Sequence, residues 1–292
     1  MTTDAQARIR ALPCWRGLAE VSPLAGGMTN HNFRVSDASG HFVVRLGVDL
    51  PEHGVLRHQE LAAARAAHAV GLSPEVVHSE PGVMVSRFID GRTLEPADLR
   101  DRLRLVQVVE LLRRCHREMA GHLALALPSF DVFTVMYAYG AQLQGWPGHL
   151  LQDRLPGLIG LAHVLQAAVE PLPVVFGHND LLAANFIDDG ARLWLIDWDY
   201  AGLGTPLFDL ANLSTNNGFG RALDQELLDV YFGGSVPPGL AGSLRAMQKA
   251  SLLREVLWAA VSACHRRMDF DYTAYTRDCL ERLDQQQRSA AE

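Results

Sequence analysis

The sequence predicts an α+β protein of two lobes, a small antiparallel sheet lobe over residues 1–90 and a larger, mainly helical lobe over residues 91–292. Three observations lead to this prediction. Between residues 20 and 46, apolar and polar residues alternate with a period of two, which is typical of antiparallel strands. From Glu95 onwards, apolar residues recur at helical spacing instead. No long linker separates the two parts, so we expect a cleft between them, a common position for a ligand.

In the first lobe, a short helix is expected before a set of strands around one further helix. The expected strands are 20–24, 32–36, 41–46, 75–78 and 82–89. The helix carries Glu60 to about Val70 and ends at Gly71, because glycine is favoured just after a helix and a proline follows closely. The dipeptide Asp90-Gly91 is a turn signal and marks the end of this lobe.

The second lobe contains helices interrupted by short apolar runs. One helical face is formed by Leu99, Leu103, Val106, Val109, Leu112 and His116. Further helices are expected at about 134–147, 156–170, 222–232, 238–266 and 271–287. Three short runs, 174–176, 184–187 and 192–196, are expected to be strands. These runs flank a polar loop at residues 178–185.

The composition is that of a globular protein, with 48% hydrophobic and 20% charged residues in a chain of 292. The first fifteen residues lack the apolar core of a signal peptide, and no run approaches the roughly 18 apolar residues of a membrane span. We therefore expect a cytoplasmic protein with no membrane partner. The four cysteines show no C-x-x-C spacing, which argues against a zinc site or a redox pair and fits a reducing compartment.

The net charge of -7 is unevenly distributed. Residues 1–92 hold nine acidic and nine basic side chains, whereas residues 93–292 hold twenty-four acidic and seventeen basic ones. This excess of negative charge disfavours nucleic acid as a partner and is compatible with a cationic small-molecule substrate. The chain contains a single lysine, Lys249.

The loop at residues 178–185 and the segment that follows it contain the side chains needed for phosphoryl transfer. Asp180 is a candidate base for the proton of an attacking hydroxyl, and Asn185 and Asp197 offer hard oxygen ligands suited to Mg²⁺. The spacing H-x-D-x-x-x-x-N resembles the catalytic loop of protein kinases. We therefore expect an enzyme that uses ATP and Mg²⁺. For His178 we expect a structural role, in which it bonds to the backbone and holds Asp180 in place.

Upstream residues are candidates for binding the nucleotide. Gly27, Thr29 and Asn30 belong to a Gly-rich turn that can approach a polyphosphate, although a plain hairpin turn explains the glycines equally well. Arg45 stands in the strand position where a kinase normally offers a lysine to phosphate, and Glu60 on the next helix is its expected ion-pair partner.

The last strand of the first lobe could present its backbone to an adenine ring. This segment contains Arg87 and Ile89, the two residues there that we include in the nucleotide site. An ordinary buried strand is the alternative interpretation.

Taken together, the motifs resemble the choline/ethanolamine kinase family, most closely its bacterial choline-kinase branch within the aminoglycoside-phosphotransferase-like superfamily. In chain order they are GGMTNHNF, VVRL, Glu60, VSRFIDGRTL, FGHNDLLAANF, LIDWDYAG and FDLANL. The resemblance spans about residues 21–215. It implies the protein-kinase-like bilobal fold, with Asp180 as base, Asn185 and Asp197 on magnesium, and Arg45 on phosphate.

The resemblance also implies a small amino alcohol, choline or ethanolamine, bound between the Asp180 loop and the C-terminal helices. A quaternary ammonium is recognised by aromatic faces and negative charge. Segments 254–258 and 269–272 supply aromatic and acidic residues, with Trp258 and Tyr272 as the leading candidates. The complete set of pocket candidates is Asp199, Tyr200, Asn216, Trp258 and Tyr272.

Two of these candidates depart from the family pattern. Asp199 stands where the family more often has Glu, and Asn216 stands where eukaryotic choline kinases carry a pocket carboxylate. An aminoglycoside, thiamine or sugar kinase of the same superfamily is therefore an alternative, and a nucleotide-binding pseudokinase regulator is an alternative of another class. Both a monomer and a homodimer agree with the sequence.

Overall fold

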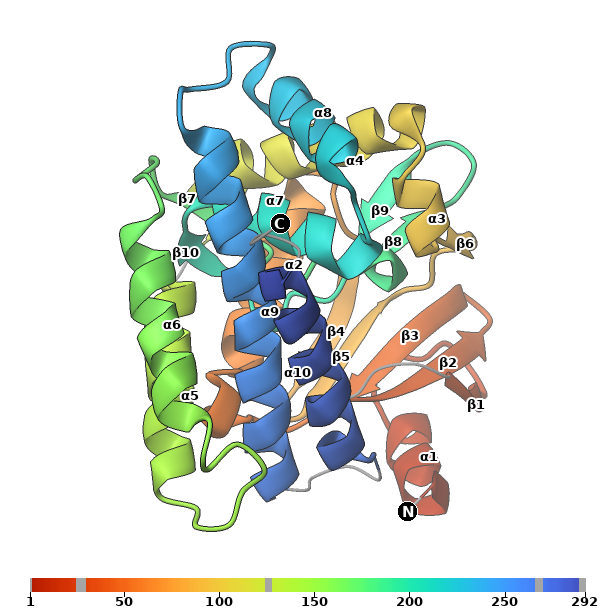
Figure 1. The fold of residues 1–292 in the computed structure, drawn as a ribbon. Coiled ribbons are helices and arrows are strands. Elements are labelled where there is room, and N and C mark those ends of the chain that lie inside the picture. Colours follow the sequence, from red (N-terminus) through yellow and green to blue (C-terminus); the bar gives the residue numbers. More distant parts are fainter. Residues whose placement is uncertain (1, 25–29, 124–127, 266–269, 289–292) are drawn as a thin grey trace.

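Five antiparallel strands form the sheet of the N-terminal part (Figure 1). The computed structural model describes residues 2–24, 30–123, 128–265 and 270–288. The strands are β1 (Glu20–Leu24), β2 (His31–Asp37), β3 (Gly40–Leu46), β4 (Val76–Glu80) and β5 (Val83–Arg87), in the order β1-β2-β3-β5-β4. The register places Asn32 opposite Arg45, and Arg45 opposite Met84. Arg45 therefore lies on a central strand.

One face of this sheet is apolar because the strands alternate. Phe33 and Val35 of β2, Phe42 and Val44 of β3, and Val83 and Val85 of β5 are buried together. Helix α1 (Thr2–Arg10) contributes Ile9 to the same small core. Every second residue of these strands is thus buried, in agreement with the two-residue period predicted from the sequence.

Helix α2 (Arg57–Ala69) belongs to the sheet lobe in sequence but packs into the core of the helical lobe. Its buried side chains are mostly alanines, including Ala63, Ala66 and Ala67, which allow neighbouring elements to approach closely. The helix is followed by Gly71, whose φ of 69° is in the left-handed region favoured by glycine. This packing holds Glu60 of α2 firmly between the lobes.

The C-terminal part is mainly helical. Its helices are α3 (Pro96–Leu99), α4 (Arg102–Glu118), α5 (Val132–Gln144), α6 (Leu155–Ala167), α7 (Pro206–Asn217), α8 (Arg221–Phe232), α9 (Leu240–His265) and α10 (Tyr272–Arg288). Helix α9 is buried along most of its length and packs against α5, α6, α7 and α10 (Figure 1). It is therefore the central helix of this lobe.

Two small antiparallel sheets support the polar loops of this lobe. Strand β7 (Val175–Gly177) pairs with β10 (Gly202–Gly204), and the second sheet has the order β6 (Arg92–Thr93), β8 (Phe186–Asp188) and β9 (Leu193–Leu195). Short 3-10 helices lie at Pro51–His53, Met119–His122 and Ala183–Asn185. The loop after β7 and the loop after β9 are consequently held at both ends by strand pairing.

The observed elements agree with most of those expected from the sequence to within a few residues. The short strands β6 and β10 were not predicted, and two helices also differ. Helix α7 was not predicted, although Thr205 caps its first turn, Pro206 is its first residue and Gly218 follows its end with a φ of 67°. The helix expected from Glu95 is divided into α3 and α4, because Asp101 caps a new helix there. Among the described residues, no helix is both long and apolar enough to cross a membrane.

Candidate active site

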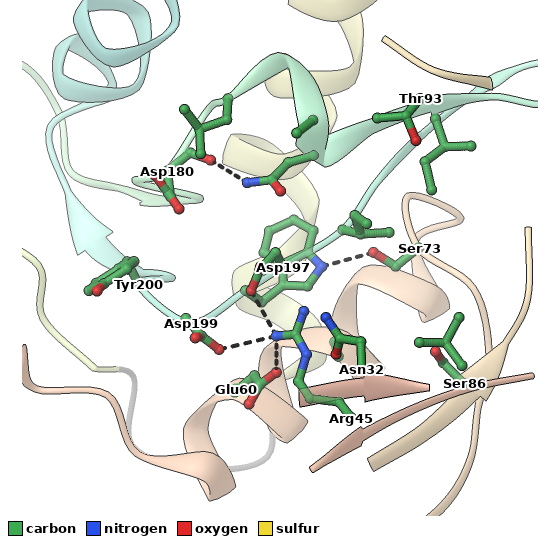
Figure 2. Close-up of a pocket in the computed structure, with 18 of the residues that line it drawn as sticks. Asn32, Arg45, Glu60, Ser73, Ser86, Thr93, Asp180, Asp197, Asp199 and Tyr200 are labelled. Atoms are coloured by element: carbon green, nitrogen blue, oxygen red, sulfur yellow. Dashed lines mark hydrogen bonds and ion pairs between the residues drawn. The ribbon is translucent and has the colours of Figure 1, made fainter. Parts of the chain in front are cut away.

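Asp180, labelled in Figure 2, and Asn185 lie at the two ends of a short loop, and both line the main cavity of the molecule. The Asn185 side-chain amide donates a 2.8 Å hydrogen bond to the backbone carbonyl of Asp180. This bond leaves the Oδ1 atom of Asn185 available as an acceptor or a metal ligand. The carboxylate of Asp180 makes no hydrogen bond to any residue that the structure describes. It therefore faces the cavity without a donor from the part of the chain that the structure describes.

His178 supports this loop from below. Its Nε2 atom lies 2.9 Å from the carbonyl oxygen of Ile196, and the backbone N–H of Asp180 donates to its Nδ1 at 3.2 Å. These partners require a neutral ring that carries its proton on Nε2. Burial lowers the pKa of His178, although nearby Asp209 opposes the shift. The structural role expected for His178 is confirmed.

Helix α7 holds the same loop from the other side. The carboxylate of Asp209 accepts hydrogen bonds from the backbone N–H groups of His178 and Asn179, at 2.8 and 2.6 Å. One helical turn further, Asn212 accepts from the N–H of Leu181 at 2.5 Å. The next turns supply Asn217, which bonds to the backbone of Leu181 and Ala183.

This support was missed from the sequence, although the motif FDLANL was noticed. The signal was the recurrence of short polar side chains at 209, 212 and 217, spaced to lie along one face of a helix that is otherwise apolar up to Leu213. His116 of α4 completes the arrangement, because its Nε2 atom lies 2.8 Å from Asp209.

Asp197 is the meeting point of the two lobes. Its backbone has a φ of 71°, which is rare outside glycine and turns its side chain toward the sheet lobe. The Nη1 atom of Arg45 lies 2.7 Å from Asp197, 2.5 Å from Glu60 and 3.3 Å from Asp199 (Figure 2). Arg57 adds a second cation, 2.5 Å from Glu60 and 2.9 Å from Asp199. The ion pair expected between Arg45 and Glu60 is present.

The electrostatics of the acidic residues differ because their partners differ. Burial raises the pKa of Asp180 to about 7, with Asp197 and Glu255 adding to the rise and Arg254 opposing it. Burial also raises the pKa of Asp199 to about 7, with Asp197 contributing. Burial acts in the same direction on Asp197, but Arg45, His178 and Arg57 together outweigh it, and the pKa of Asp197 is lowered. Asp180 is thus suited to take up a proton, whereas Asp197 stays ionised.

The donor set is suitable for a hard divalent cation. Glu60, Asp197 and Asp199 each offer a carboxylate oxygen, and these oxygens lie within 4.8 Å of one another. Asn185 offers an uncharged oxygen from the same cavity. Carboxylate and amide oxygens are the ligands that Mg²⁺ prefers in proteins. The residues present therefore fit a magnesium ion beside Asp197.

All these groups open into one cavity of about 580 Å³ between the lobes. The sheet lobe and helix α2 contribute to its lining Val43, Arg45, Ala64, Val76, Met84, Ser86, Arg87, Phe88 and Ile89. At the opposite end lie Asp180, Tyr200, Asn216, Arg254, Glu255, Trp258 and Tyr275. A phosphate donor and an acceptor alcohol can thus share one enclosed space.

The structure places most predicted site residues around this cavity, with corrections. Tyr272 does not line it; this residue is 5% exposed and packs its ring on Phe270 and Trp258, and Tyr275, one turn further along α10, lines the cavity instead. Asp199 was predicted to line the substrate pocket. Its carboxylate instead forms ion pairs with Arg45 and Arg57 near the sheet lobe.

Other predicted nucleotide-site residues need separate comment. Gly27 and Thr29 lie outside the described residues, as does Asp269 of the expected aromatic and acidic wall. Asn30 is buried, and its side-chain amide donates to Asp199 at 3.2 Å. Arg87 lines the cavity, and its guanidinium contacts Glu75 and the ring of Phe42.

Comparison with known proteins agrees with this geometry. Residues 20–246 match the family described as phosphotransferase enzymes. The chain is 28% identical over 210 residues to protein LicA of Haemophilus influenzae, and 28% identical over 211 residues to a probable ethanolamine kinase of Arabidopsis thaliana. These alignments cover 70% and 67% of this chain, but only 61% and 55% of the two relatives. The chain thus spans less than two thirds of the length of these relatives.

Among solved structures, a choline/ethanolamine kinase family protein from Mesorhizobium loti is 30% identical, with a TM-score of 0.78 over 98% of this chain and 94% of that one. Choline kinase LicA from Streptococcus pneumoniae shares the fold, with a TM-score of 0.76 at 21% identity. The chain therefore belongs to the phosphotransferase enzyme family. The bilobal kinase-like fold and the resemblance to choline and ethanolamine kinases are confirmed.

Proposed function

We propose that this phosphotransferase moves the γ-phosphoryl group of ATP to the hydroxyl of a small amino alcohol of the choline and ethanolamine class. One observation carries the proposal: Asp180, Asn185, Asp197 and Arg45 open into the same cavity as a wall of acidic and aromatic side chains. The names of the similar proteins from Haemophilus influenzae, Arabidopsis thaliana and Mesorhizobium loti support it.

Asp180 is the proposed catalytic base. The acceptor hydroxyl would attack the γ-phosphorus directly, so that one P–O bond forms while the bond to the β-phosphate oxygen breaks and ADP leaves. The hydroxyl proton would pass to the Asp180 carboxylate, which has no competing donor among the described residues and a pKa raised to about 7. His178 and Asp209 would keep this carboxylate in position through the loop backbone.

Arg45 is the proposed phosphate ligand. All three of its ion-pair contacts go through Nη1, which leaves the edge formed by Nε and Nη2 for an oxyanion. Such an edge binds phosphate oxygens in a bidentate manner. The adenine ring would lie against the apolar side chains of Val43, Ala64 and Met84, near the end of β5.

The magnesium ion would be held by Asp197 and Asn185, with Glu60 and Asp199 close enough to complete its surroundings. When bound, it neutralises phosphate charge and draws electron density from the bond that breaks. Arg45 and Arg57 hold the three acidic side chains together in the meantime.

We also propose that the boundary between the lobes lies near residue 90. Strand β5 of the large sheet ends at Arg87, and β6 begins at Arg92 in the small sheet of the helical lobe. Only a few residues therefore connect the lobes at this point. They lie beside the cavity, because Phe88, Ile89 and Gly91 line it.

An ADP-release assay with Mg-ATP tests this function. The acceptors are choline, ethanolamine, thiamine, an aminoglycoside and two sugars. We expect turnover with an amino alcohol, its loss in Asp180→Asn, and its retention in Asp153→Asn, which changes an exposed aspartate outside the cavity. Full turnover by Asp180→Asn would contradict the assignment of Asp180 as the catalytic base. ATP binding without turnover of any acceptor would contradict the proposed function.

A further inference from the structure

Two of the aromatic side chains at the acceptor end of the cavity, Tyr200 and Trp258, each have a face covered by another side chain. The guanidinium of Arg254 lies 4.4 Å above the ring of Tyr200. The ring of Trp258 packs on His53, with centroids 5.3 Å apart, and Trp258 is only 4% exposed. A quaternary ammonium is held mainly by open aromatic faces. These two rings therefore offer little to a trimethylammonium group.

Tyr200 and Trp258 are also fixed relative to each other. The indole N–H of Trp258 donates a 2.8 Å hydrogen bond to the Tyr200 hydroxyl. Rotating either ring to expose a face would break this bond and separate Arg254 from Tyr200. Tyr200 and Trp258 thus form a fixed wall with little open ring surface.

The group that this wall presents to a ligand is the carboxylate of Glu255. Glu255 lines the same cavity as Asp180, and its side chain is 21% exposed. One oxygen accepts a 2.8 Å hydrogen bond from the Tyr275 hydroxyl, and the other lies 3.2 Å from Nη1 of Arg254. Two carboxylate oxygens can accept about four hydrogen bonds, so capacity remains. Its orientation is set before any ligand arrives.

The charged side chains at the acceptor end of the cavity favour binding of one cation. Two acidic side chains, Asp180 and Glu255, line the acceptor end beside one almost completely buried cation, Arg254. Because burial raises the pKa of Asp180 to about 7, a bound cation would also favour the ionised form of Asp180. Arg282 also borders the cavity, but it is exposed and its guanidinium reaches the carbonyl of Thr215. A ligand with one positive charge would balance the acceptor end. Asn216, which is uncharged, does not supply this negative charge, whereas Glu255 does.

We infer that Glu255 selects the acceptor, and that it selects an ammonium that carries N–H groups, as in ethanolamine, over the quaternary ammonium of choline. The inference rests on the proposed function and narrows its substrate class. An N–H group can donate a charge-assisted hydrogen bond to the free lone pairs of Glu255, whereas a trimethylammonium group has no N–H to donate. Its three methyl groups would also keep the charge away from the carboxylate.

The test measures kcat/KM for ethanolamine and its N-methyl, N,N-dimethyl and N,N,N-trimethyl derivatives, the last of which is choline. Because each of the first three ammonium ions retains an N–H and choline has none, the largest fall is expected at the last methyl group, by about tenfold or more. Glu255→Gln should lower kcat/KM for ethanolamine by about 30-fold and that for choline by less than about threefold. Glu255→Asp should retain part of the preference.

Glu281→Gln is the matched control, because it removes one exposed carboxylate from α10 outside the cavity. It should leave the whole series unchanged. Thermal unfolding of each variant shows whether the fold is retained. A wild-type preference for choline, or an equal loss for all four alcohols in Glu255→Gln, would overturn the inference while leaving the kinase function intact.

Calorimetric titration of the same alcohols, without ATP, keeps the inference testable even if no turnover occurs. Ethanolamine should bind more tightly than choline to the wild-type protein, and Glu255→Gln should abolish the difference. Equal binding of both alcohols by the wild-type protein would refute the role of Glu255. Absence of turnover with all four alcohols would instead count against the proposed function.

Discussion

The Nη1 atom of Arg45 lies 2.7 Å from a carboxylate oxygen of Asp197, so a central strand of the sheet lobe and the loop after β9 are joined across the cavity. The same nitrogen lies 2.5 Å from Glu60 on α2. Three elements that are distant in sequence therefore converge on one cation. The left-handed backbone of Asp197 makes this possible, because it turns the side chain toward the sheet.

Replacing Arg45 should affect the nucleotide more than the acceptor. Among the described residues, Arg45→Met leaves Glu60, Asp197 and Asp199 with only Arg57 as a nearby cation, and it removes the proposed phosphate ligand. We expect kcat/KM for ATP to fall about 100-fold or more in Arg45→Met. Arg45→Lys should restore part of this kcat/KM, because lysine keeps the positive charge but lacks the planar guanidinium that binds phosphate in a bidentate manner. Steady-state kinetics with varied ATP measures this change.

Arg65→Met is the matched control for Arg45, since Arg65 is an exposed residue of α2 whose guanidinium contacts only Ser79 among the described side chains. Its kinetics should equal those of the wild type. An Arg45→Met enzyme with normal kcat/KM for ATP would show that Arg45 serves only to join the lobes.

Asp180→Asn should stabilise the metal-free protein at high pH. The folded-state pKa of Asp180 is raised to about 7, above the roughly 3.9 of an unfolded chain, so the folded state binds more protons between these values. The wild type therefore loses stability as pH rises from about 4 to 7. At pH 8 we expect the variant to be more stable by about 1–2 kcal/mol, because each pKa unit is worth about 1.4 kcal/mol and partial solvent contact weakens the effect.

Urea unfolding at two pH values, about 5 and 8, checks this expectation, because the two values fall within and above the titration range of Asp180. The advantage of the variant should be smaller at the lower value. Asp153→Asn, at an exposed position, should show no such trend. An Asp180→Asn protein that gains equally at both pH values would place the origin of the gain elsewhere.

Asp209→Asn should weaken both the fold and catalysis. The fully buried carboxylate accepts from the N–H groups of His178 and Asn179 and contacts His116, whereas an amide has one oxygen and would point its NH₂ group at a donor. We expect a loss of about 2–4 kcal/mol in the free energy of unfolding, as for other buried hydrogen-bonded charges. Denaturant unfolding measures this loss.

The catalytic effect of Asp209→Asn should appear mainly in kcat, with KM for ATP little changed. The reason is that Asp209 contacts the loop backbone and does not line the cavity. A normal kcat in a destabilised protein would separate the stability of the helical lobe from the placement of Asp180.

Asn185→Ala should raise the requirement for magnesium. The substitution removes an uncharged oxygen ligand and the hydrogen bond to the carbonyl of Asp180. We expect the Mg²⁺ concentration for half-maximal activity to rise by about tenfold or more, since loss of a single ligand or its support commonly costs this much. The thermal shift on adding Mg-ATP should shrink in parallel.

Asn216→Ala, in the same cavity but in the acceptor wall, is the control for Asn185. Its magnesium dependence should match that of the wild type. If Asn185→Ala responded to magnesium as the wild type does, the metal ligands would have to be sought among Glu60, Asp197 and Asp199 alone.

Much of the fold was predictable because it follows from local patterns. Each of these patterns can be recognised within a short segment of sequence. They are the two-residue period of the sheet lobe, the helical periods beyond Glu95, and the spacing of Asp180, Asn185 and Asp197. Helix α7 was overlooked because its buried polar residues interrupt the apolar pattern that identifies a helix. Those residues, Asp209 and Asn217 among them, are buried in order to bond the loop backbone.

The sequence by itself determined which residues are candidates for the base, the metal ligands and the phosphate ligand, because these candidates are recognisable by residue type and spacing. Only the tertiary structure decided which faces of those residues are free. It showed that Arg254 covers Tyr200, that Tyr275 and not Tyr272 lines the cavity, and that Glu255 is open to a ligand. The physical reason is that spacing along a helix shows which residues share a face. Whether other side chains cover that face depends on elements that are distant in the sequence.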